Sequence, residues 1–117
     1  ITVAGVAYRI HPVHQSDGWI AYAERVDTGR RFGVECAAAT DWEAIDRVGR
    51  WLAWQDEHAG ALAALQEAEN AYHRTIAGSA FASPTEGPSP IELQQESLHA
   101  LEAARTRLDD IRARKPL

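Results

Sequence analysis

The stretch "RVDTGRRFGVECAAATDWEAI", residues 25–45, decides the fold, because a strand pattern gives way to a helix pattern within it. Its segment "DTG" supplies a three-residue hairpin loop, with Gly29 at the position that favours positive φ. The following "RRFGVEC" alternates in the manner of a strand. The segment "TDWE" forms a capping box, in which the Thr40 hydroxyl accepts from the backbone N–H of Glu43. The stretch therefore predicts the end of a β-hairpin followed at once by a helix.

Two earlier segments complete a predicted meander. Residues 3–13, "VAGVAYRIHPV", and residues 19–26, "WIAYAERV", alternate between apolar and polar side chains. Between them, residues 14–18, "HQSDG", are typical of a five-residue loop. With that loop length Ile10 faces Tyr22, and both hairpins place their larger apolar side chains on one face. That face is expected to hold Val6, Tyr8, Ile10, Ile20, Tyr22, Val26, Phe32, Val34 and Cys36.

Helical spacing then persists from Thr40 to about residue 76, a length of about 54 Å at 1.5 Å per residue. Such a helix exceeds one small sheet, so we expect it to project or to break, with Gly60 the favoured break. Residues 77–90, "AGSAFASPTEGPSP", indicate a linker, and a second helix is expected from Pro90 to Ala113.

The predicted fold class is therefore α+β. A three-stranded antiparallel β-meander packs on a long α-helix, and an antiparallel helical hairpin follows. The predicted division is a sheet module at residues 1–54 and a helical hairpin at residues 55–117, with the linker at 77–90. A chain of 117 residues is long enough to bury a real core.

The amino-acid composition disfavours some classes of protein and favours others. The net charge of −5 disfavours a generic nucleic-acid binder, and no apolar run approaches the roughly 20 residues that span a bilayer. A single cysteine suggests a reducing compartment, so a cytoplasmic location is expected. Arginine greatly outnumbers lysine, which favours a GC-rich, bacterial genome. Because the sequence contains no methionine, we expect further sequence before Ile1.

Catalytic signatures are missing from the sequence. It contains no GxSxG elbow, no Walker loop and no GxGxxG. His11 and His14 are spaced so that a strand would place them on opposite faces, which disfavours a zinc site. Cys36 ends an apolar alternation, as a buried structural cysteine does. We therefore expect a non-catalytic protein with no cofactor, no metal and no small-molecule substrate.

An excess of tryptophan on the first helix suggests a function. Trp42, Trp51 and Trp54 fall within thirteen residues, and tryptophan is enriched at interface hot spots. We therefore favour a protein–protein interaction or oligomerisation module that uses the helical hairpin, with a protein partner or a second copy in a homodimer. A second helix covering these residues within one chain is the open alternative. The predicted contact residues are Trp51, Trp54, Leu62, Leu65, Tyr72, Leu98, Leu101 and Leu108.

The runner-up function is a nucleic-acid-binding regulatory domain that contacts phosphates through the outer face of the sheet. In the expected register Arg25 and Arg31 lie directly opposite each other, which is unfavourable for like charges unless an anion or an acid lies between them. An aromatic side chain beside arginines can also stack on a base. The ordinary interpretation is a solvated sheet face. The predicted contact residues are Arg9, His11, Trp19, Arg25 and Arg31.

Overall fold

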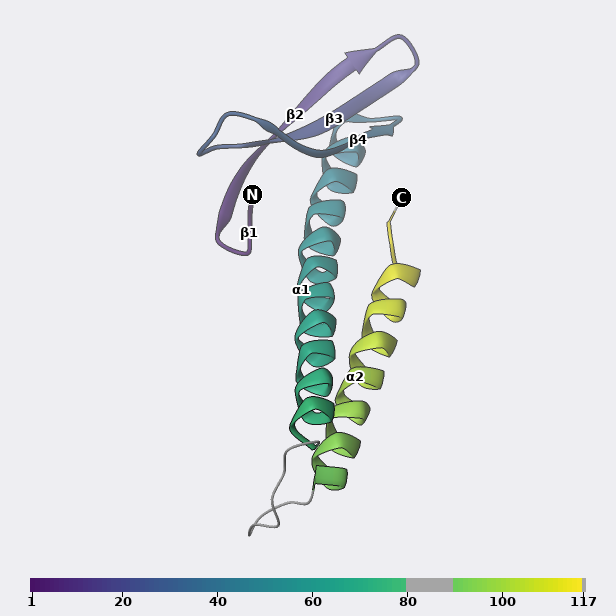
Figure 1. Ribbon diagram of the computed structural model, residues 1–117. Helices are drawn as coiled ribbons and strands as arrows, with labels where there is room; N and C mark the ends of the chain where they lie inside the picture. The colour runs from purple at the N-terminus through teal and green to yellow at the C-terminus, as the bar shows by residue number, and fades with distance from the viewer. Residues whose placement is uncertain (80–89, 117) are drawn as a thin grey trace. The chain divides into compact units, whose positions relative to one another are not determined.

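The computed structural model describes residues 1–79 and 90–116, in which one antiparallel sheet precedes two helices (Figure 1). The α+β class and the two helices are confirmed, but the predicted three-stranded meander is wrong, because the sheet has four strands. In chain order the elements are β1 (Thr2–Val3), β2 (Val6–Gln15), β3 (Gly18–Arg25), β4 (Arg31–Ala38), α1 (Asp41–Ser79) and α2 (Pro90–Ala113).

The chain forms two compact units. Of the described residues, the first comprises 1–57 with 115–116, and the second comprises 58–79 with 90–114. Helix α1 runs through Gly60, where we expected a break; a helical glycine costs only about 1 kcal/mol relative to alanine. The predicted linker at 77–90 is shortened, because α1 continues to Ser79 and α2 begins at Pro90. The remaining linker positions, 80–89, lie outside the described residues.

The additional strand arises from a tight turn. Val3 pairs with Val6 across Ala4 and Gly5, whose φ angles are 51° and 80°. Two successive positive φ values are the signature of a type I′ hairpin turn. The alternating pattern continues through this turn, so the sequence resembled a single strand. The turn imposes backbone strain at Ala4, because a Cβ disfavours the left-handed region.

Replacing Ala4 by asparagine is expected to stabilise the first unit by about 0.5–1 kcal/mol, since asparagine tolerates positive φ and Asn-Gly is the favoured type I′ sequence. Urea denaturation followed by tryptophan fluorescence measures the change. Ala4→Val is the opposing control, because a β-branched residue resists positive φ. Equal stability of the two variants would contradict this account of the turn.

The register of β2 against β3 differs from the prediction by one residue. Ile10 pairs with Ala23, and the connection is the two-residue turn at 16–17 rather than a five-residue loop. A slip of one residue exchanges the two faces of a strand. As a result Ile20 and Tyr22 lie on the outer face of the sheet, away from α1, which corrects their predicted position.

Small side chains explain which face of β3 is buried. Ala21 and Ala23 are fully buried in a cluster with Cys36 and with Val48 and Leu52 of α1. An alanine surface lets a helix approach the sheet closely, and larger residues then pack around the contact. Counting apolar size alone favoured the opposite face. The partly buried residues around this cluster include Val3, Tyr8, Ile10, Trp19, Phe32, Ile45 and Trp51.

A bulge in β4 completes the core. Cys36 pairs with Ala21 and Phe32 pairs with Ala23, so three residues of β4 lie opposite Tyr22 alone. Phe32 and Cys36 pack with the core as predicted. Val34 is 37% exposed, so its predicted place on the apolar face is wrong. The bulge interrupts the period of two that the prediction assumed.

The capping interaction at the start of α1 is confirmed. The backbone N–H of Glu43 donates to Thr40 Oγ1 at 3.3 Å, and Arg47 donates from Nη1 to the carbonyl oxygen of Ala37. The first contact satisfies a terminal N–H of α1, and the second ties that helix to the end of β4. None of the described helices has both the length and the apolar character that crossing a membrane requires.

The second unit is an antiparallel helical hairpin. Arg112 Nε donates to His58 Nε2 at 3.3 Å, which joins the last turns of α2 to the first turn of this unit's part of α1. Ala61 is buried on α1, and the larger Leu101, Leu108 and Ile111 are buried on α2. Small residues facing large ones allow two helices to interdigitate closely.

Candidate protein-interaction surface

The outer face of the sheet holds a connected row of polar and aromatic side chains. The Arg31 guanidinium lies 3.8 Å from the centroid of the Tyr22 ring, and the His11 ring stacks on Tyr22 at 5.1 Å. Arg31 Nη1 also lies 2.8 Å from Glu35 Oε1. His11 Nε2 lies 3.4 Å from Glu24 Oε2 without hydrogen-bond geometry. Carboxylates thus flank both ends of the row, and the face carries no concentrated positive charge.

The structure separates the residues predicted to bind nucleic acid. Arg9, His11 and Arg31 share the outer face, whereas Trp19 packs against the core on the other face. Arg31 pairs with Glu24 and not with Arg25, which corrects the predicted opposition of the two arginines.

Arg25 is engaged by a neighbouring carboxylate. Its Nε and Nη2 atoms donate to the two oxygens of Asp27 at 3.1 and 2.8 Å. These hydrogen bonds raise the pKa of Arg25 and lower the pKa of Asp27. Two of the three predicted phosphate-binding arginines, Arg25 and Arg31, therefore already hold acidic partners.

The edges of the sheet are poorly suited to adding a strand from a partner. The backbone N–H of Tyr8 points away from β3 and donates to the carbonyl of Ile1. Backbone groups of every second residue in a strand point the same way, so the backbone nitrogen of Pro12, four residues further on, also faces outward. Proline lacks the N–H that an added strand would need. At the opposite edge the bulge after Phe32 disrupts the ladder. Both features are known protections of exposed edges.

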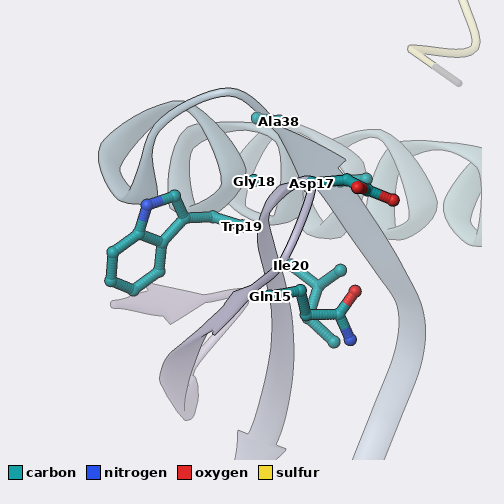
Figure 2. A pocket seen from close by; sticks show the side chains of 7 residues that line it. Gln15, Asp17, Gly18, Trp19, Ile20 and Ala38 are labelled. Atoms are coloured by element: carbon teal, nitrogen blue, oxygen red, sulfur yellow. The ribbon is translucent and has the colours of Figure 1, made fainter.

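The hollows of the first unit include a small one and a larger one. One, of about 80 Å³, lies beside the β2–β3 turn, where the side chains of Trp19 and Asp17 point to opposite sides (Figure 2). The other, of about 410 Å³, is lined mainly by aliphatic residues, among them Ile1, Ile10 and Ile45. The first is smaller than usual ligand sites. The charged lining residues of the second, Asp46 and Arg50, pair with each other at 2.9 Å.

Cys36 lies in the core, 2% exposed. Burial raises the pKa of its thiol, and the nearby Arg47 charge opposes this effect. A neutral buried thiol is a poor nucleophile and a poor metal ligand. Among residues 1–79 and 90–116, no three His, Cys, Asp or Glu side chains gather as a metal site would require.

The predicted hairpin residues divide into two groups. Trp51 packs edge-on against Phe32, with ring centroids 6.2 Å apart, while Leu101 and Leu108 are buried between the helices. These three residues therefore serve the chain's own core, which corrects their assignment to a partner surface. Trp54 is half-buried, with Lys115 Nζ 5.6 Å from its ring.

Of the remaining predicted residues, Leu62 is exposed, whereas Leu65, Tyr72 and Leu98 are half-buried. The contact between His58 and Arg112 gives a reference point for one side of the hairpin. Helical steps from His58 lead to one set of α1 residues, and steps of seven back from Arg112 lead to one set of α2 residues. We define the open face of the hairpin as Leu62, Leu65, Glu69, Tyr72 and Ile76 of α1 with Ile91, Leu98 and Arg105 of α2.

Three side chains of the open face are large, apolar and exposed. Leu62 is 46% exposed, Ile76 is 42% exposed and Ile91 is 68% exposed. Our site prediction omitted Ile76 and Ile91, although a spacing of seven connects each of them to the set. It also omitted Trp42, which is 65% exposed in the first turn of α1.

Comparison with known proteins identifies no relative. No protein-family model, no curated protein and no solved structure matches the chain. Among the described residues, the open face of the hairpin exposes the large apolar side chains of Leu62, Ile76 and Ile91.

Proposed function

We propose that the chain is a non-catalytic interaction module that self-associates through the open face of the hairpin. The exposure of Leu62, Ile76 and Ile91 carries this proposal. The seam inside the hairpin is already filled by Leu101, Leu108 and Ile111, so these exposed residues are surplus to its packing. Contiguous exposed apolar side chains on a small protein mark interaction sites.

The size of the hairpin supports the proposal. Two helical segments of about 20 residues measure about 30 Å by 20 Å, or about 600 Å² for each copy. A pair would bury about 1,200 Å², which reaches the range of stable interfaces. The three longer strands offer only about 370 Å² for each copy. Two hairpins packed on their open faces would form a four-helix bundle.

Replacing Leu62 and Ile76 together by glutamate is expected to convert a dimer into a monomer, because four charges would enter an apolar interface. Sedimentation equilibrium at about 5–100 µM measures the change, with a dissociation constant at least about 100-fold weaker, corresponding to about 3 kcal/mol.

Ala63→Glu with Ala77→Glu is the matched control. Each substitution adds the same charge one residue further round the helix, at an exposed position outside the open face. The control is expected to remain dimeric. A wild-type chain that is monomeric throughout this range would overturn the proposal, and so would equal weakening by both double variants.

A further inference from the structure

We infer that the partner is a second copy of this chain, placed so that α1 of each copy packs along α2 of the other, with Glu69 beside the partner's Arg105. The inference rests on the proposed function and specifies its geometry. Two-fold symmetry offers two ways to bring the open faces together, with the axis either across the helices or along them.

The intrachain register determines which residues share a level along the hairpin. The hydrogen bond from Arg112 Nε to His58 Nε2 brings these two positions together, and the helices run in opposite directions with the same rise per residue. Counting along both helices from that contact places Leu65 level with Arg105 and Tyr72 level with Leu98. Glu69 therefore lies near the middle of the open face, one turn from the level of Arg105.

A two-fold axis across the helices would lay α1 on the partner's α1. The centre of that contact would bring Glu69 against the partner's Glu69. Two carboxylates that approach each other in a partly desolvated interface repel, and such repulsion costs affinity. Charge therefore disfavours this arrangement.

A two-fold axis along the helices gives the opposite result. Helix α1 then lies antiparallel to the partner's α2, with Tyr72 beside the partner's Leu98 and Ile76 near the partner's Ile91. Glu69 reaches the partner's Arg105 along one helical turn, and symmetry repeats this pair. Residues 1–79 and 90–116 contain no ion pair of either Glu69 or Arg105, so both charges are available to a second copy.

Charge reversal tests the arrangement in the full chain. Glu69→Arg and Arg105→Glu are each expected to weaken the dimer about tenfold, because each turns two attractive pairs into repulsive ones. The double variant should return to within about threefold of the wild type, since the pairs are restored with their signs exchanged. Sedimentation equilibrium at low salt gives the three constants, and circular dichroism checks that helicity is unchanged.

Glu96→Arg is the matched control, because Glu96 lies on the side of α2 opposite to Leu98 and is exposed. It should leave the dissociation constant unchanged. A tighter dimer in Glu69→Gln would indicate the arrangement with paired Glu69 residues and overturn the inference. A dimer insensitive to both reversals would also overturn it, while leaving self-association intact. A wild-type monomer would instead remove the proposed function itself.

Discussion

Replacing Gly33 by alanine is expected to destabilise the first unit by about 2–5 kcal/mol, a large part of the stability of a small domain. Gly33 has a φ of 84°, and a Cβ at this position would lie 2.4 Å from Cζ3 of Trp51. The substitution combines left-handed backbone strain of about 1–2 kcal/mol with overpacking of about 1–3 kcal/mol. Urea denaturation followed by tryptophan fluorescence measures the loss.

Gly29→Ala separates these two costs. Gly29 also has a positive φ, 68°, but a Cβ there would meet no heavy atom within 4 Å. Its substitution is expected to cost about 1 kcal/mol from the backbone alone. Equal losses at Gly29 and Gly33 would show that the Trp51 ring moves aside freely, which would contradict the tight packing described for the bulge.

The elements of this fold were readable from local signals. The capping box placed the start of α1, the proline at position 90 placed the start of α2, and the turn residues separated β2, β3 and β4. Each signal depends on backbone chemistry within a few residues, so it does not require knowledge of the packing. The α+β class follows from their order.

The register could not be obtained in the same way. Whether Tyr22 or Ala23 faces the helix depends on how closely α1 approaches the sheet, which is a tertiary property. The sequence pattern favoured burial of the larger residue. The alanines are buried instead, because their small side chains let the helix pack close to the sheet. The bulge beside Gly33 had the same origin, since it accommodates Trp51, a residue eighteen positions away in the sequence.

These differences also explain which predicted site residues were lost. In the observed register Trp19 lies on the face opposite Arg31, so the residues predicted to bind phosphate do not share one face. In the hairpin the prediction grouped apolar residues into one broad stripe along each helix, whereas the structure divides each stripe into buried and exposed residues. Leu101 and Leu108 turn inward, while Leu62 lies on the open face.

Replacing Leu52 by alanine is expected to cost about 2–5 kcal/mol, because it removes one of the largest fully buried side chains among the described residues and leaves a cavity between α1 and the sheet. Leu62→Ala makes the same chemical change on the same helix at a position that is 46% exposed, where the cost to the monomer should stay below about 0.5 kcal/mol.

The concentration of protein must be low in both measurements, because self-association adds stability by mass action. At higher concentration Leu62→Ala should lose stability relative to the wild type, since it weakens the proposed dimer, whereas the penalty of Leu52→Ala should not depend on concentration. A large penalty for Leu62→Ala in the dilute monomer would mean that Leu62 packs within its own chain, and the open face would then lose one of the exposed residues that support self-association.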